Sequence, residues 1–95
     1  MSQPFTSSSS NVFADLGFDH EEAALLAVKS RLLSALADHV ETYATQMAAA
    51  EALGVAQPRV SEIVKGRLSR FSTDLLVKLC YRAGLQVTAD VTTAA

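Results

Sequence analysis

The stretch QMAAAEALGVAQPRVSEIVK, from Gln46 to Lys65, decides how this chain is expected to fold. Two short helices that cross closely at a steep angle need a small residue on the first helix, and Ala50 provides it. The turn between them needs a residue that tolerates a positive φ angle, and Gly54 provides that. Apolar residues for a core shared by the two helices follow in register: Ala49, Leu53, Val55, Val60, Ile63 and Val64. This spacing predicts a helix-turn-helix over about residues 45–65, in preference to an ordinary hairpin of two helices in a bundle.

The ends of these two helices are marked in the sequence as well. Thr45 can cap a helix over residues 46–53, which Gly54 ends. The next helix is expected over residues 57–65, with Pro58 in its first turn, where a missing backbone N–H costs nothing. Gly66 ends this second helix.

Further helices are expected on both sides of the motif. Asp19 is a good N-cap for a long helix over residues 20–41, and a break near Ser30 is the alternative to one continuous helix. The apolar stripe of this helix contains Leu25, Leu32, Leu36 and Val40. Ser72 can cap a last helix, which Gly84 ends.

The two ends of the chain differ from this helical part. Residues 1–11 are predicted to form a flexible tail, because they bury too little apolar surface to offset the entropy of ordering. Apolar and polar residues alternate at the other end, which predicts a β-strand. A lone strand must pair, so we expect it to pair with a second subunit through Leu85, Val87, Ala89 and Val91. The chain thus divides into a tail (1–11), a helix-turn-helix domain (12–84) and a dimerisation segment (85–95).

Composition agrees with this fold class. Ninety-five residues make one domain, and 49% of them are hydrophobic, much of this being Ala and Leu, which favour helix. We therefore predict an all-α bundle of four to five helices with a short C-terminal β-strand that pairs across a homodimer.

Charge is divided unevenly along the chain. The formal net charge is −2, but residues 1–42 carry two cations against six anions, whereas residues 43–84 carry six cations against three anions. A positive second half on an acidic chain indicates a local basic surface and hence a polyanionic partner. Double-stranded DNA is the polyanion that a helix-turn-helix binds.

The second helix of the motif supplies the candidate base-reading residues. A recognition helix presents its N-terminal side chains to base edges in the major groove. Gln57 can pair with adenine, Ser61 can reach a base edge or a phosphate, and Arg59 can read guanine or hold a phosphate. Glu62 can accept a hydrogen bond from cytosine, or it can instead form an ion pair with Arg59 or Lys65.

Phosphate contacts are expected on both sides of these residues. Thr45 and Gln46 begin the first helix of the motif and can donate to the DNA backbone. The loop after the second helix is basic, and it either clamps the sugar–phosphate strand or is merely a solvated run of charges. The expected phosphate-binding residues are Thr45, Gln46, Lys65, Arg67, Ser69 and Arg70.

A short apolar segment before the long helix has two interpretations. Val12, Phe13, Leu16 and Phe18 place four apolar anchors in eight residues. They form either an arm packed on the domain core or a docking segment for a protein partner, which would use Val12, Phe13 and Phe18. The alternative partner surface is the acidic face of the following helix, which would suit a basic partner and contains Glu21, Glu22, Asp38 and Glu41.

Other classes of protein are disfavoured. The sequence has no nucleophile–base pair, no paired acids and no phosphate-binding loop, so we predict neither an enzyme nor a cofactor. His20 and His39 stand alone, so no metal site is expected, and the single Cys80 is expected to be a buried thiol. No apolar run is long enough to span a membrane and no secretory signal is present, which predicts a location in the bacterial cytoplasm.

The segment from Gln46 to Lys65 resembles the XRE (Cro/C1-type) helix-turn-helix family. The wider chain is similar to the HigA-type antitoxin branch through NVFADLGF at Asn11 and QPRVSEIVKGRLSRFSTDLLVKL from Gln57 to Leu79. The resemblance implies a dimeric repressor of its own toxin–antitoxin operon that neutralises a small toxin by direct binding. A stand-alone or phage-type regulator without a toxin is the alternative. Ala56 and Ala48 depart from the family's pattern, and the first departure puts one phosphate contact in doubt.

Overall fold

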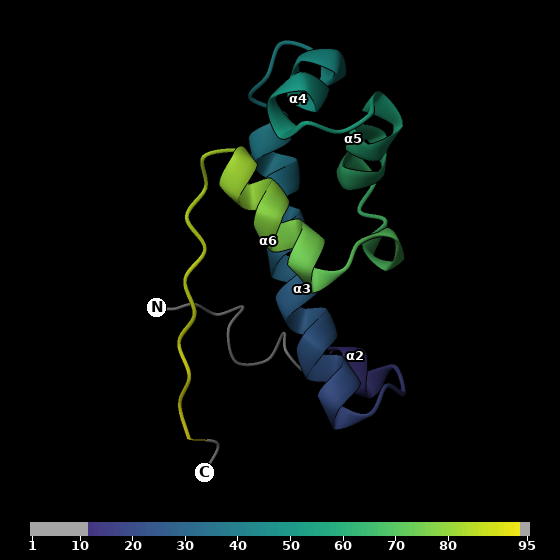
Figure 1. Ribbon diagram of the computed structural model, residues 1–95. Helices are drawn as coiled ribbons and strands as arrows, with labels where there is room; N and C mark the ends of the chain where they lie inside the picture. Colours follow the sequence, from purple (N-terminus) through teal and green to yellow (C-terminus); the bar gives the residue numbers. More distant parts are fainter. Residues whose placement is uncertain (1–11, 94–95) are drawn as a thin grey trace.

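One long helix, α3 (His20–Val40), forms the axis against which the other helices pack (Figure 1). The computed structural model describes residues 12–93, and its other helices are α2 (Val12–Asp15), α4 (Gln46–Leu53), α5 (Gln57–Val64), the 3₁₀ helix η1 (Leu68–Arg70) and α6 (Thr73–Arg82). Helix α6 packs along α3, α4 and α5 lie near the carboxyl-terminal end of α3, and α2 lies at its amino-terminal end. The expected helical bundle is therefore confirmed, whereas residues 1–11, predicted to be a flexible tail, lie outside the described part.

Local side-chain caps explain where the main helices begin. Each cap is a side-chain oxygen that accepts a hydrogen bond from a backbone N–H three residues later. The pairs are Asp19 with Glu22 at 2.8 Å, Thr45 with Ala48 at 3.0 Å, and Ser72 with Leu75 at 3.1 Å. Helix α3 continues through Ser30 without a break, because neither glycine nor proline interrupts it. All three predicted caps form.

The hydrophobic core lies between the carboxyl-terminal half of α3 and the helices that surround it. Its fully buried leucine and isoleucine side chains are Leu36, Leu53, Ile63, Leu76 and Leu79. Phe71, directly after η1, is also buried and closes the core on that side. Burying one such side chain stabilises a fold by about 1.5–3 kcal/mol relative to leaving it exposed. This core fixes α5 firmly against α3 and α4.

The turn between α4 and α5 is held at two points. Gly54 takes the left-handed conformation with φ 69°, which a residue with a Cβ adopts only with strain. The Arg82 guanidinium, at the end of α6, donates a hydrogen bond to the backbone carbonyl of Leu53 at 3.0 Å. The last helix of the bundle thus binds the end of α4 directly.

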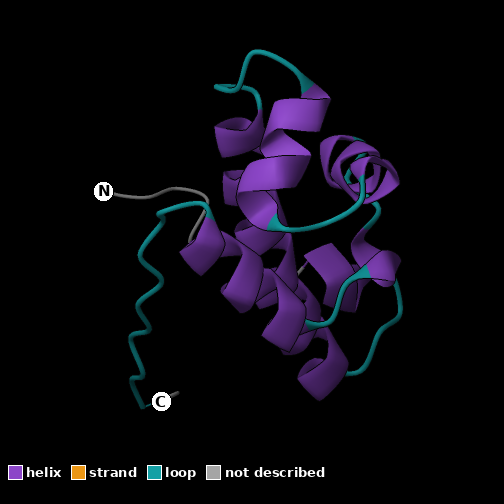
Figure 2. Cartoon of the chain, turned by 45° about the horizontal axis from the view of Figure 1, so that its top comes forward, coloured by secondary structure: helices purple, strands orange, loops and turns teal. Residues whose placement is uncertain are grey.

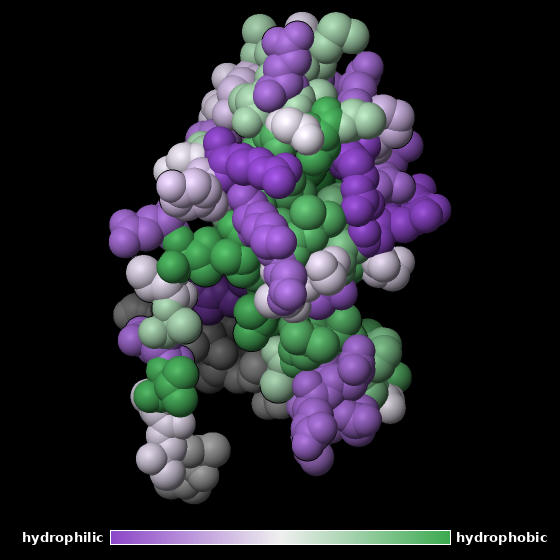
Figure 3. Space-filling model, in the orientation of Figure 1, coloured by the Kyte–Doolittle hydropathy of each residue, from purple (hydrophilic) through white to green (hydrophobic). Residues whose placement is uncertain are grey.

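The amino-terminal half of α3 extends beyond the core and carries α2 beside it. The rings of Phe13 and Phe18 meet edge to face with centroids 6.1 Å apart. Val12 and Phe18 are about half exposed, and Leu16 is 70% exposed. Figure 3 shows apolar side chains reaching the surface over α2 and the lower part of α3, with hydrophilic ones at the tip. The segment is therefore an arm that packs on α3 outside the core, and it still leaves apolar surface open.

The predicted C-terminal strand is not supported. Every regular element drawn in Figure 2 is a helix, and residues 85–93 run as an extended segment along one side of the molecule. A strand requires a hydrogen-bonded neighbour about 4.8 Å away, and the described part of a single chain offers no second extended segment. Leu85 is half-buried against the core, whereas Val91 is exposed. The alternating sequence therefore produces extended backbone but no sheet within one chain.

Candidate nucleic-acid interface

Helix α5 is anchored by one face and open on the other. Val60 and Ile63 are fully buried, and Pro58 stands in the first turn as expected. On the outer side, Gln57 is exposed and Ser61 is half-buried. The polar residues at the beginning of the helix therefore face away from the core, which is the arrangement that a recognition helix requires.

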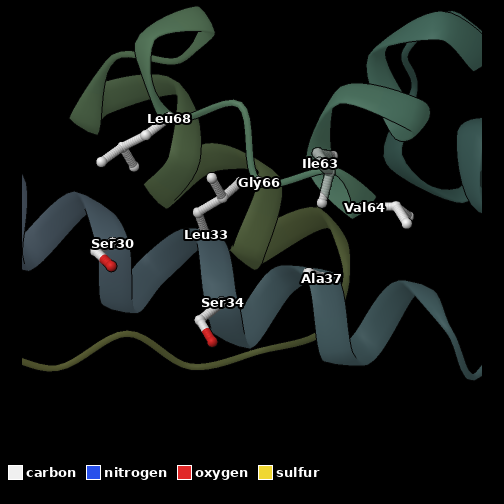
Figure 4. A pocket seen from close by; sticks show the side chains of 8 residues that line it. All are labelled: Ser30, Leu33, Ser34, Ala37, Ile63, Val64, Gly66 and Leu68. Carbon is white, nitrogen blue, oxygen red and sulfur yellow. The ribbon is translucent and has the colours of Figure 1, made fainter.

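The spacing of the apolar residues predicted that Val64 lies in the core, and this was wrong. It is 39% exposed and, with Leu33, Ile63 and Leu68, lines a shallow hollow of about 270 Å³ between α3, α5 and the start of η1 (Figure 4). Four residues at about 100° per residue turn Val64 by roughly 40° from the direction of the buried Val60. This rotation places Val64 at the margin of the packed face.

Arg59 is held in place by three different groups. Its Nη1 donates to Glu62 Oε1 at 3.1 Å and to the backbone carbonyl of Arg70 at 2.9 Å. Its guanidinium carbon lies 4.6 Å from the centre of the Phe71 ring, which is a cation–π arrangement. The predicted base reader is thus engaged by the protein itself.

Glu62 pairs with two arginines. Besides Arg59, its carboxylate lies 3.7 Å from Arg70 Nε. An ion pair with Arg59 or Lys65 was one of the two interpretations of Glu62 from the sequence; the pair with Arg59 forms, and the second partner, Arg70, was not expected. The sequence could not show this contact, because it depends on how the chain turns after α5.

The basic segment after α5 is ordered by a turn that sequence reasoning did not predict. Gly66 has φ 70°, and the chain then forms η1 over Leu68–Arg70. Lys65, Arg67 and Ser69 are exposed, and the Arg70 side chain is 62% exposed. Figure 3 shows hydrophilic side chains gathered on the side of the molecule where α5 and η1 lie. The structure therefore brings the predicted phosphate-binding cations to the flank of α5.

The other predicted phosphate contacts lie at the start of α4. The hydroxyl oxygen of Thr45 accepts the capping hydrogen bond from Ala48, and its own hydrogen is available to a different acceptor. Gln46 is half-buried in the first turn of α4. Ala56 caps α5 without any side-chain hydrogen bond, as expected for a residue that lacks a polar side chain.

The remaining chemically reactive residues lie outside this surface. Cys80 is buried in α6, and desolvation raises the pKa of its thiol. The His39 ring meets the Tyr43 ring edge to face at 5.5 Å. Over residues 12–93, no group of three His, Cys, Asp or Glu side chains is arranged to hold a metal ion. Arg82, which sequence analysis had counted only as a charge, ties α6 to the helix-turn-helix.

Comparison with known proteins agrees with this geometry. Residues 12–92 match the helix-turn-helix domain family, so the chain belongs to that family. Its class is that of DNA-binding regulators. No curated protein and no solved structure was found to match the chain. In the part that the structure describes, no helix has both the length and the apolar character needed to cross a membrane.

Restoring the missing cap of α5 should stabilise the protein. Ala56 already has the extended backbone of an N-cap residue, with φ −72° and ψ 150°. In Ala56→Ser, the new hydroxyl can accept from a backbone N–H in the first turn, which adds about 1 kcal/mol to the free energy of unfolding. The midpoint of thermal unfolding should rise by roughly 4–8 °C at a fixed protein concentration.

Ala52→Ser is the matched control, because Ala52 is exposed inside α4, where serine has the lower helix propensity. That variant should lower the midpoint slightly. An equal effect of both substitutions would show that the start of α5 does not need a cap.

Proposed function

We propose that this chain is a sequence-specific transcriptional repressor that binds operator DNA as a homodimer. The observation that carries the proposal is the combination found at α5. One face of this helix is fully buried through Val60 and Ile63, and the polar face lies beside the exposed cations Lys65, Arg67 and Arg70. A rigid helix with a cationic flank is suited to the major groove between two phosphate strands.

Each part of the surface has a role in this complex. Gln57 and Ser61 lie where a helix inserted into the major groove meets base edges, and a glutamine amide pairs with adenine. Thr45 and Gln46 at the start of α4 reach one phosphate strand, while the cations after α5 and Ser69 hold the other strand. One α5 reads only a half-site, so two copies are needed, with half-sites about 34–36 Å apart.

The salt dependence of binding tests the phosphate contacts. Two copies of Lys65, Arg67 and Arg70 give six cations, so the logarithm of the association constant should fall with a slope of about −5 against log salt. Between 50 and 200 mM salt, affinity for the DNA upstream of the chain's own gene should drop roughly 10³-fold. Arg67→Gln removes two of the six contacts and should reduce the slope by about 2. Fluorescence anisotropy with labelled DNA measures both quantities.

Lys78→Gln is the control, because it removes the same charge from an exposed site on α6, outside the helix-turn-helix. Its slope should match that of the unchanged protein. If no upstream segment is bound even at low salt, the repressor proposal is wrong.

We place the contact between the two subunits of the homodimer in the C-terminal segment. Val87 and Val91 alternate with polar residues and are exposed, as are Val77 and Tyr81 on the outer side of α6. Extended backbone with open hydrogen-bonding groups is a template for pairing with another chain. We infer that two copies of residues 85–91 form an antiparallel ribbon across a twofold axis, with Leu85, Val87, Ala89 and Val91 on its apolar face.

Charges on the apolar face of this segment should separate the subunits. The double variant Val87→Asp with Val91→Asp places four carboxylates on the apolar face of the ribbon, where desolvation and mutual repulsion oppose pairing, so dimer affinity should fall about tenfold or more. Sedimentation velocity at micromolar concentration should show the shift towards monomer. Gln86→Lys with Thr92→Lys places two charges on the polar face instead, which already carries Asp90, and should leave the dimer intact. A dimer that survives both double variants is assembled elsewhere.

A second role, as the antitoxin of a type II toxin–antitoxin pair, is favoured by the surface around α2. Val12, Leu16 and Phe18 are exposed there, next to Asp15, Glu21 and Glu22. An apolar patch rimmed by carboxylates is complementary to a small basic protein. The resemblance to HigA-type antitoxins points to the same kind of partner. A gene for a small basic protein beside this one would favour the antitoxin over a stand-alone or phage-type regulator.

Leu16→Lys tests this partner surface. Leu16 is 70% exposed, so the substitution should leave the fold intact, yet it places a cation where a basic partner would bind. Affinity for the small basic protein encoded beside the gene should fall about tenfold or more, measured by calorimetry. Ala44→Lys adds the same charge at an exposed site beyond the opposite end of α3 and should have no effect. Undiminished affinity of Leu16→Lys would remove α2 from the interface.

A further inference from the structure

We propose that Arg59, Glu62, Arg70 and Phe71 form a brace that fixes the basic turn η1 against α5, so that Arg59 is a positioning residue and base reading falls to Gln57 and Ser61. The inference rests on the proposed repressor function, because it assigns roles within the same DNA-binding surface. It changes two residues, Arg59 and Glu62, from readers of base pairs to parts of the protein's own framework.

The contacts of Arg59 reach from α5 to the end of η1. One of its terminal nitrogens donates both to Glu62 and to the Arg70 carbonyl, at 3.1 and 2.9 Å. Its guanidinium also lies over the Phe71 ring, and Phe71 is only 2% exposed. A planar guanidinium that is stacked and doubly hydrogen-bonded must break all three contacts before it can reach a base.

The direction of the side chains around α5 separates braced from open residues. At 3.6 residues per turn, Arg59 lies about 160° around the helix from Gln57, whereas Ser61 lies only about 40° from Gln57. The flank with Arg59 and Glu62 faces η1, as their contacts with Arg70 show. Gln57 and Ser61 therefore share the polar flank that is turned away from the brace.

The ion pairs of Glu62 also offset the negative charge that its carboxylate places near the DNA. A carboxylate beside a phosphate strand repels it, but this carboxylate is paired with two arginines. Arg70 contacts Glu62 through Nε and keeps 62% of its side chain exposed, so its terminal nitrogens remain open to a phosphate. Arg59 holds the backbone of Arg70 while Glu62 holds its side chain, and both contacts set the position of the cation that meets DNA.

Base-pair preference distinguishes a positioning residue from a reader. Arg59→Gln should weaken binding to the operator and to all its single-base-pair variants by similar factors, with the rank order of the variants kept. Glu62→Gln should behave alike, and the double variant should be no worse than the stronger single variant, since the two residues act as a unit. Gln57→Ala should instead lose about 5- to 150-fold of discrimination at one base pair.

Amide hydrogen exchange of the protein without DNA tests the brace independently. The N–H groups of Arg70 and Phe71 donate to the carbonyls of Arg67 and Leu68, and their exchange should become about tenfold faster in Arg59→Gln. Arg59→Lys keeps the charge but loses the planar fork, so it should speed exchange as well. This variant provides the test if Arg59→Gln is poorly folded. Arg67→Gln, in the same turn but outside the brace, should leave exchange unchanged while lowering the salt slope.

Two results would overturn the inference. Unchanged exchange at residues 68–71 in both Arg59 variants would show that no brace exists. A loss of preference at a single base pair in Arg59→Gln, with other positions spared, would show that Arg59 reads DNA. If the unchanged protein binds no DNA, the proposed repressor function and the base-reading assignment are both wrong. Faster exchange in the Arg59 variants would still support the brace in that case.

Discussion

The proposed DNA-reading surface depends on the burial of two β-branched side chains. Val60 and Ile63 lie one turn apart on α5, and both are completely enclosed by the core. A branched side chain has few rotamers, so two of them in a packed interior fix how far the helix is rotated about its own axis as well as where it lies. This rotation decides that Gln57 and Ser61 emerge on one flank and Arg59 and Glu62 on the other. The burial of Val60 and Ile63 therefore both stabilises the bundle and determines which side chains of α5 are exposed.

Features that depend on interactions within a few residues could be predicted from the sequence. The caps at Asp19, Thr45 and Ser72 each join a side chain to a backbone N–H three residues away. The end of α4 at Gly54 depends on one backbone conformation. For this reason the expected helices over residues 20–84 agree with the observed ones to within about two residues at each end.

Features that depend on distant parts of the chain, or on another chain, could not be predicted in this way. The hydrogen bond from Arg59 to the Arg70 carbonyl spans eleven residues and depends on the turn at Gly66 and η1. From sequence, Arg59 was a candidate to read guanine or hold a phosphate, and its contacts with Glu62, the Arg70 carbonyl and Phe71 appear only in the folded chain. The alternating C-terminal residues predicted a β-strand, and this was wrong for the single chain, because a strand needs a hydrogen-bonded neighbour that residues 12–93 do not provide.

The continuity of α3 has a mechanical consequence. Twenty-one residues without a glycine or proline make a rod about 30 Å long, with the α2 surface at one end and the helix-turn-helix at the other. Such a rod has no hinge at which one end can move while the other stays still. If a partner binds at α2 as proposed, it would therefore change the orientation of the whole domain, including the helix-turn-helix, and not of α2 alone. In a dimer, a small change of orientation at one end would change the distance between the two recognition helices. DNA has a fixed helical repeat, so only a narrow range of that distance allows both helices to bind.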